Sequence, residues 1–129
     1  MKNAIIIFLA AFMVISCNAQ QKQGVELVSP TEFSQKIDSE DGQLIDVRTP
    51  GEYKSGHIEG AVNIHIYDND FEQRIDTLDK NKPVYVYCKV GGRSSEAVEI
   101  MQAKGFKHIV ELKGGIDAWN EAGKPVAKK

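Results

Sequence analysis

The sequence has little of what several classes of protein require. Its 129 residues include two cysteines and one tryptophan, so a scaffold held together by several disulfides is excluded. Basic residues number 16 against 18 acidic residues, and no basic stretch is interleaved with aromatic residues, which argues against a nucleic-acid partner. No apolar run reaches the roughly 18 residues that indicate a membrane-spanning helix.

What is present is the composition of a folded domain. Hydrophobic residues make up 42% of the sequence and charged residues 26%, which is typical of a globular protein. Neither internal repeats nor low-complexity tracts are found in the sequence. The length leaves room for one domain of ordinary size.

The first sixteen residues are typical of a secretory signal. Residues 1–3 carry one positive charge, residues 4–15 are all apolar, and small and polar residues follow at once. Such a run is too short to cross a bilayer comfortably and matches the apolar centre of a signal peptide; the alternative is a buried core helix. We therefore predict a signal peptide over residues 1–16, a polar, Gln-rich tether over residues 17–24 and one domain over residues 25–129.

The end of this signal resembles the bacterial lipoprotein box. Residues 14–17 (VISC) place a small residue directly before a cysteine, which becomes the acylated first residue of the mature protein in such boxes. We expect Cys17 to be lipidated and to anchor the protein on the periplasmic face of a bacterial membrane. Asn18 does not resemble the acidic inner-membrane retention signal, which favours the outer membrane. The alternative is cleavage after Ala19, which would give a soluble periplasmic protein.

Strand and helix signals alternate along the predicted domain. We expect strands at residues 26–28, 43–47, 61–64, 84–87 and 108–112, and helices at residues 30–37, 49–55, 71–78, 94–104 and 115–122. The alternation predicts an α/β fold with an open, mostly parallel sheet and helices on both faces. Residues 84–87 (VYVY) have the β-branched and aromatic composition of a central strand covered on both sides.

Cys88 lies where this central strand ends, at the edge at which open α/β sheets collect ligands. Either form of signal cleavage leaves Cys88 as the single thiol of the exported domain. Such a cysteine is either an inert buried side chain or a reactive group. Gly91 and Gly92 allow backbone N–H groups to turn inward as an anion-binding nest, and the helix that begins near Ser94 directs its positive end to the same place.

Two cations stand in the same loop. Lys89 and Arg93 each add a full positive charge near Cys88, although either side chain could point outward. Positive charge and a helix N-terminus both favour a thiolate over a thiol. The alternative is a structural cysteine beside a simple Gly-Gly turn.

Four motifs resemble, in order, those of the rhodanese family. They are residues 44–53 (LIDVRTPGEY), 56–64 (GHIEGAVNI), 87–94 (YCKVGGRS) and 112–119 (LKGGIDAW). Together they extend over nearly all of the predicted domain. His65 stands where the family usually has proline, a departure at the exit of a strand.

The resemblance implies a five-stranded parallel sheet and a sulfurtransferase activity. Cys88 would attack the outer sulfur of thiosulfate or another sulfane donor and carry it as a persulfide, and cyanide or a thiol would then accept the sulfur. The active-site loop would bind the substrate through Lys89, Val90, Gly91, Gly92, Arg93 and Ser94. No cofactor is required.

Two other functions are compatible with the same fold. One is a non-catalytic module that carries sulfur or binds a partner, although inactive relatives generally lack the cysteine. The other is a small phosphatase, but phosphatase relatives place five residues between the cysteine and the arginine. Here only four residues separate Cys88 from Arg93, which favours sulfur transfer.

The remaining polar candidates have structural alternatives. Asp46 and Arg48 follow a strand expected near the loop, where Asp46 would hold Arg93 or a loop N–H group and Arg48 would add positive potential. The alternative is an ion pair between the two residues or with Glu52. The three histidines share no metal-ligand spacing, so no metal site is expected.

Overall fold

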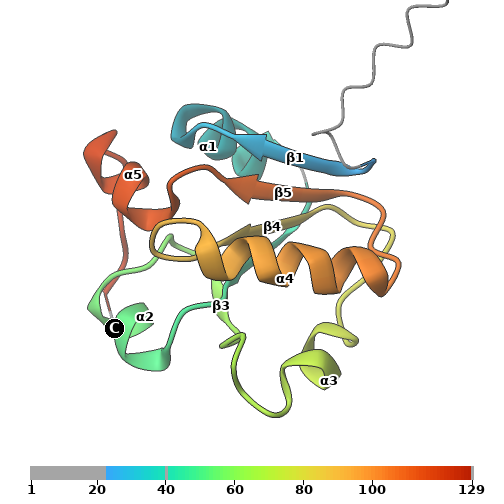
Figure 1. The fold of residues 1–129 in the computed structure, drawn as a ribbon. Helices are drawn as coiled ribbons and strands as arrows, with labels where there is room; N and C mark the ends of the chain where they lie inside the picture. The colour runs from blue at the N-terminus through green and yellow to red at the C-terminus, as the bar shows by residue number, and fades with distance from the viewer. Residues whose placement is uncertain (1–22, 40, 129) are drawn as a thin grey trace, which may run out of the picture.

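A single parallel sheet organises the part of the chain that the computed structural model describes, residues 23–39 and 41–128 (Figure 1). The strands are β1 (Val25–Val28), β2 (Gln43–Asp46), β3 (Val62–Asn63), β4 (Val84–Tyr87) and β5 (Ile109–Leu112). The helices are α1 (Pro30–Ser39), α2 (Pro50–Ser55), α3 (Phe71–Ile75), α4 (Gly92–Ala103) and α5 (Gly115–Glu121). The predicted signal peptide, Cys17 and the tether as far as residue 22 lie outside the described residues.

The strand order is β1-β5-β4-β2-β3, and each neighbouring pair is parallel. This confirms the predicted α/β fold with a five-stranded parallel sheet. Because the strands are parallel, their carboxyl ends share one edge of the sheet. The segments that follow β2, β4 and β5 therefore meet at that edge.

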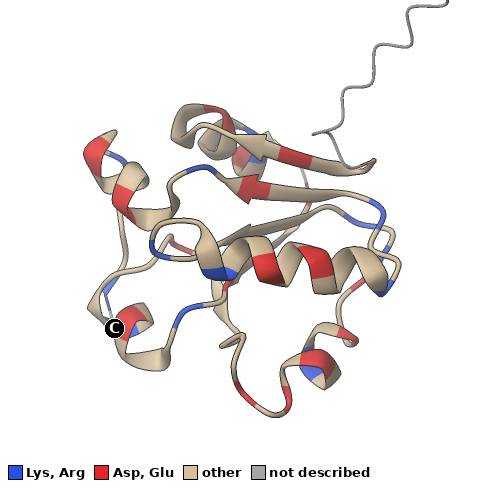
Figure 2. Ribbon diagram, in the orientation of Figure 1, with Lys and Arg blue, Asp and Glu red and all other residues tan. Residues whose placement is uncertain are grey.

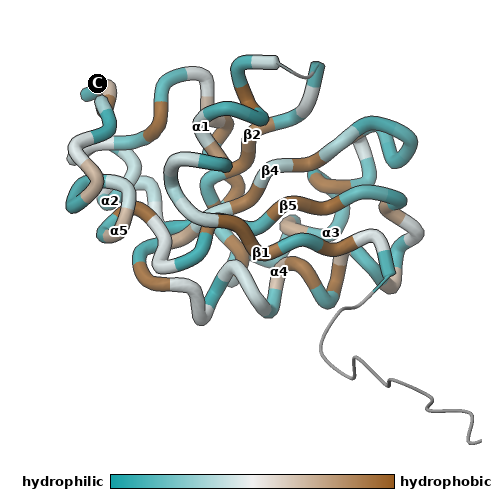
Figure 3. Tube along the Cα trace, turned by 90° about the horizontal axis from the view of Figure 1, so that it is seen from above, coloured by the Kyte–Doolittle hydropathy of each residue, from teal (hydrophilic) through white to brown (hydrophobic). Residues whose placement is uncertain are grey.

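The core has two layers, one on each face of the sheet. Helices α3 and α4 pack with Val84 and Val86 on one face, and α1, α2 and α5 pack with Tyr85 and Tyr87 on the other. All four residues of β4 are buried, which confirms the central strand predicted from its composition. Figure 3 shows the hydrophobic strands between the two layers.

Several helix ends differ from the prediction by one to three residues, and two of these differences, in α4 and α3, have a visible cause. Helix α4 begins at Gly92 rather than near Ser94, because Gly91 adopts φ 120° and caps the helix earlier. Helix α3 ends at Ile75 rather than near Leu78. The backbone N–H groups of Thr77 and Leu78 donate to carbonyls three residues back, which tightens the chain into turns.

The surface is mixed in charge. Basic and acidic segments are interspersed over the helices and loops (Figure 2). Within residues 23–39 and 41–128, no helix has the length and hydropathy to cross a membrane.

Candidate active site

Cys88 follows β4 directly and turns into the loop that leads to α4. Its Sγ accepts a hydrogen bond from the backbone N–H of Gly91 at 3.0 Å and lies 3.4 Å from Oγ of Ser94. Gly91 has a positive φ of 120° and is the N-cap of α4, so the sulfur lies beside the N-terminus of that helix. The expected grouping of cysteine, glycine and helix N-terminus is therefore present.

The sulfur is more enclosed than the sequence indicates. Cys88 is only 1% exposed, whereas Val90 at the tip of the loop is 64% exposed. The sequence predicts a nest of several backbone N–H groups around the sulfur. Among the described residues, one backbone N–H group, that of Gly91, is hydrogen-bonded to Sγ. A Cβ atom added at Gly91 or Gly92 would meet nothing within 4 Å, which leaves open space beside the loop.

Arg93, in the first turn of α4, is paired across the loop with α2. Its guanidinium donates to both carboxylate oxygens of Glu52 at 2.7 and 2.9 Å. This pair lowers the pKa of Glu52 to about 2, mainly through the hydrogen bonds from Arg93. Glu52 is itself held by a capping box with Thr49 at the start of α2. The positive charge expected from Arg93 is therefore balanced by a carboxylate that the sequence did not assign to it.

Lys89 is likewise paired at the surface. Its ammonium group lies 2.7 Å from a carboxylate oxygen of Asp117 in α5, and both side chains are about half exposed. Beneath this pair, the backbone N–H groups of Ile116 and Asp117 donate to the carbonyls of Cys88 and Lys89 at 2.9 and 3.1 Å. The first turn of α5 thus supports the start of the loop that follows β4.

Gly115 makes this contact possible. It has φ 60°, and a Cβ atom there would lie 2.4 Å from the carbonyl oxygen of Lys89 and 2.5 Å from that of Cys88. The close approach gives a physical reason for the second glycine of the segment 112–119 (LKGGIDAW).

Asp46 and Arg48 pair with each other. Their side chains are buried and joined at 2.6 Å, and Arg48 also donates to the carbonyl of Gly56 at 2.7 Å. The ion-pair alternative is therefore confirmed, and among the described residues Asp46 makes no hydrogen bond to Arg93. Arg48 also lies over the ring of Tyr87 at 5.6 Å. The pair ties the end of α2 to the sheet beneath the loop.

Behind the sulfur lies a carboxylate that sequence reasoning missed. Oε2 of Glu111, on β5, accepts from Oγ of Ser94 at 2.7 Å and from Oγ of Ser95 at 3.0 Å. Glu111 is 6% exposed. A lone acidic residue within the otherwise apolar strand 109–112 (IVEL) is the sequence signal that could have identified it.

The loop borders a hollow between α2 and α5. Its volume is about 440 Å³, and Arg48, Glu52, Lys89, Asp117 and Lys128 line it. No cluster of His, Cys, Asp and Glu suited to a metal ion occurs in residues 23–39 and 41–128. Among the described residues, the site consists of one sulfur atom with two ion pairs, Arg93–Glu52 and Lys89–Asp117, in the surrounding segments.

Comparison with known proteins agrees with this geometry. The family model "Rhodanese-like domain" matches residues 29–122. A sulfurtransferase of Allochromatium vinosum is 32% identical over 103 residues, which are 79% of this chain and 94% of the relative. The thiosulfate sulfurtransferase GlpE of Shewanella oneidensis is 30% identical over 95 residues, 74% of this chain and 92% of the relative.

A solved structure shares the fold as well. The rhodanese-related protein of Thermoplasma volcanium superposes with a TM-score of 0.72 at 31% identity, covering 81% of this chain and 99% of that protein. The family match, the sulfurtransferase relatives and the strand order agree with one another. The chain belongs to the rhodanese-like domain family.

Proposed function

We propose that this protein is a sulfurtransferase that carries sulfane sulfur on Cys88. The observation on which the proposal rests is the placement of Sγ at the N-terminus of α4, with the N–H of Gly91 donating to it at 3.0 Å. A hydrogen-bond donor and a helix N-terminus both stabilise a sulfur anion. The relatives named as sulfurtransferases support the same chemistry.

The reaction has two steps. The Cys88 thiolate attacks the outer sulfur of thiosulfate; a sulfur–sulfur bond forms, the bond to the sulfonate breaks with its electron pair, and sulfite leaves. The enzyme then holds a Cys88 persulfide anion. Cyanide or a thiolate acceptor attacks the outer sulfur, receives it as thiocyanate or a persulfide, and returns the Cys88 thiolate. Charge and atoms balance in each step, and no cofactor takes part.

Because Cys88 is 1% exposed, the donor must reach Sγ by a movement of the loop. The loop is suited to this movement, since Gly91 and Gly92 carry no side chains and have open space beside them. Its carbonyls at Cys88 and Lys89 remain held by α5. We infer that the segment 90–92 opens while the base of the loop stays fixed.

Turnover separates this function from its alternatives. The purified domain is incubated with thiosulfate and cyanide, and thiocyanate is measured, with Cys88→Ser as the control. We expect thiocyanate to form repeatedly with the native protein and not with Cys88→Ser. Sulfur uptake on Cys88 without turnover would favour a sulfur-carrier role, and hydrolysis of an aryl phosphate without sulfur uptake would favour a phosphatase.

We further propose that Cys17 is lipidated and anchors the domain on the periplasmic face of the outer membrane. The proposal rests on the sequence of residues 1–18 alone. Expression of the full chain in a bacterium followed by membrane fractionation tests it. The native chain should sediment with outer membranes and Cys17→Ser should not; equal release of both into the soluble periplasmic fraction would favour cleavage after Ala19.

A further inference from the structure

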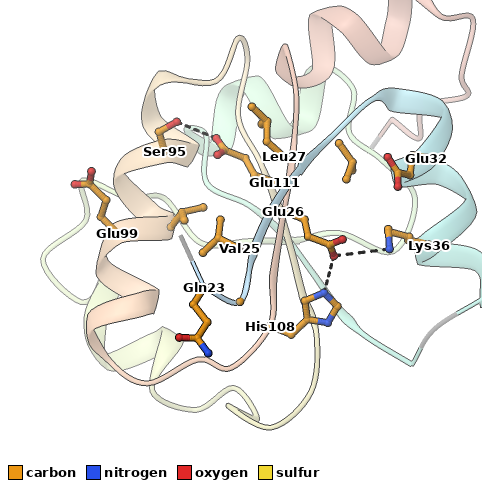
Figure 4. A pocket seen from close by; sticks show the side chains of 13 residues that line it. Gln23, Val25, Glu26, Leu27, Glu32, Lys36, Ser95, Glu99, His108 and Glu111 are labelled. Atoms are coloured by element: carbon orange, nitrogen blue, oxygen red, sulfur yellow. Dashed lines mark hydrogen bonds and ion pairs between the residues drawn. The ribbon is translucent and has the colours of Figure 1, made fainter. Parts of the chain in front are cut away.

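Glu111 is a buried carboxylate to which the two-step reaction assigns no role. It lies on the α4 face of β5, one hydroxyl group away from the reacting sulfur. Its Oε2 contacts Oγ of Ser94 at 2.7 Å, and the same Oγ is 3.4 Å from Sγ of Cys88. On its other side Glu111 lines a pocket of about 990 Å³ between β1, α1 and α4, where Figure 4 shows its bond to Ser95.

The hydroxyl of Ser94 has three neighbours that can accept a hydrogen bond but only one proton to give. The neighbours are Oε2 of Glu111 at 2.7 Å, the carbonyl of Gly91 at 3.2 Å and Sγ of Cys88 at 3.4 Å. A carboxylate makes the shorter and stronger bond, so the proton is directed to Glu111. Oγ of Ser94 then presents a lone pair to the sulfur, an arrangement that suits a thiol S–H and opposes a thiolate.

Ser95 gives Glu111 a second connection to the loop. Oγ of Ser95 is 3.0 Å from Oε2 of Glu111 and 2.8 Å from the carbonyl of Gly91. The N–H of that same Gly91 holds Sγ of Cys88. Glu111 is therefore connected to the loop around the sulfur through both serine hydroxyls.

We infer that Glu111 is a positioning residue that orients the Ser94 and Ser95 hydroxyls behind Cys88 and thereby sets the pH range in which the sulfur reacts. The inference deepens the proposed function and rests on it. The N–H of Gly91 and the end of α4 favour the thiolate, whereas Glu111 with Ser94 favours the thiol. The balance of the two decides the pH above which the cysteine attacks a donor.

Other titratable groups lie near the sulfur and the carboxylate on neighbouring elements. Around Cys88 they are Arg93 with Glu52, Lys89 with Asp117, and Tyr67 with Glu96; around Glu111 they are Glu26, Lys36, His108, Glu32 and Glu99. Glu26 is already paired with other groups, since its Oε2 lies 2.8 Å from Nε2 of His108 and 3.7 Å from Nζ of Lys36 (Figure 4). Among these carboxylates of the described residues, Glu111 is the one that accepts a hydrogen bond from Oγ of Ser94, the hydroxyl beside the sulfur.

The test is the rate of Cys88 alkylation by iodoacetamide as a function of pH. Glu111→Gln keeps an oxygen that accepts from the serines but removes the charge. We expect its profile to move to lower pH by about one unit, which is about tenfold faster alkylation below both midpoints. Glu32→Gln removes an exposed carboxylate of the same pocket and is expected to leave the profile unchanged. An unchanged profile in Glu111→Gln would overturn the inference.

Ser94→Ala provides a second test that does not depend on the folding of the first variant. If Oγ of Ser94 only accepts a hydrogen bond from the Cys88 thiol, the loss of this hydroxyl also moves the alkylation profile of Cys88 to lower pH. A shift to higher pH, or no shift, would show that Ser94 does not act in this way and would overturn the inference. Alkylation needs no sulfur donor, so it tests Glu111 separately from sulfur transfer. If both variants shift the alkylation profile to lower pH but the native protein forms no thiocyanate, the proposed function is refuted and the role of Glu111 is retained.

Discussion

At position 93, the guanidinium that would attract an anion is already shared with a carboxylate. Arg93 and Glu52 form a two-point ion pair whose side chains are 23% and 30% exposed. Arg93 also interacts electrostatically with Cys88. Because a nearby positive charge favours a sulfur anion and a nearby negative charge opposes it, removing either partner of the pair is expected to change the reactivity of Cys88 in opposite directions.

This opposition predicts a pattern among three variants. Arg93→Ala leaves the carboxylate of Glu52 uncompensated and should move the alkylation profile of Cys88 to higher pH. Glu52→Gln should move it to lower pH, each by up to about one unit. The double variant should lie near the native profile. Identical profiles for Arg93→Ala and the native protein would contradict this account of the pair.

The same pair predicts how stability depends on pH. Arg93 lowers the pKa of Glu52 from 4.5 to about 2 through its hydrogen bonds. Because the folded-state pKa lies below the unfolded value, the stabilisation is complete above about pH 4.5 and is lost as pH falls towards 2. After allowance for solvent screening, its size is about 1 kcal/mol.

Urea unfolding of the native protein and of Glu52→Gln checks this prediction. The difference in the free energy of unfolding between them should be largest near pH 6 and should shrink between pH 4.5 and 2. Glutamine also serves in a capping box, so the start of α2 remains capped in the variant. A difference that stays constant down to pH 2 would assign the effect to something other than the ionised pair.

Among the elements, α5 has the least expected role. Its first turn donates two backbone hydrogen bonds to the carbonyls of Cys88 and Lys89, and Gly115 is the residue that allows the approach. Gly115→Ala should therefore push α5 away from the loop and lower the free energy of unfolding by about 2–4 kcal/mol. It should also slow sulfur uptake by Cys88.

Gly123→Ala is a matched control for this variant. Gly123 also has a positive φ of 71°, but a Cβ atom there would meet nothing within 4 Å. It should cost about 1 kcal/mol of backbone strain and leave the rate of sulfur uptake unchanged. Equal losses of stability and rate in the two variants would remove the argument for a brace between α5 and the loop.

The elements themselves were largely predictable, because each leaves a local signal. The buried strand 84–87 and the glycine that starts α5 can be recognised from neighbouring residues alone, whereas the start of α4 was predicted two residues too late. The length of α3 was predicted wrongly, since Phe71, Ile75 and Leu78 keep their helical spacing while the backbone tightens into turns. Apolar spacing shows which side chains face the core, but not whether the backbone between them remains helical.

At the scale of the whole molecule, the order of the sheet decides which distant residues meet. Cys88 and the carboxyl end of β2 were expected at one edge, and the parallel order places them there together with the carboxyl end of β5. The partners of the loop could not be predicted, because they depend on where side chains from separate segments point. Glu52 and Arg93 are 41 residues apart in the sequence, and Glu111 and Ser94 are 17 residues apart, yet each pair is hydrogen-bonded.

Burial is the second property that emerges only from the whole fold. The sequence places Cys88 at a strand end, where it could be either exposed or enclosed. In the structure, the loop, α4 and α5 together leave it 1% exposed. The proposed mechanism therefore requires the segment 90–92 to open before a donor can reach the sulfur.

The central claim is that this enclosed sulfur nevertheless accepts sulfur from a donor. The most direct measurement is the intact mass of the purified domain after incubation with thiosulfate, with Cys88→Ser alongside. The account predicts a gain of one sulfur atom that is absent in Cys88→Ser and is removed by cyanide. A native domain that keeps its mass, under conditions in which a known thiosulfate sulfurtransferase is loaded, would contradict it.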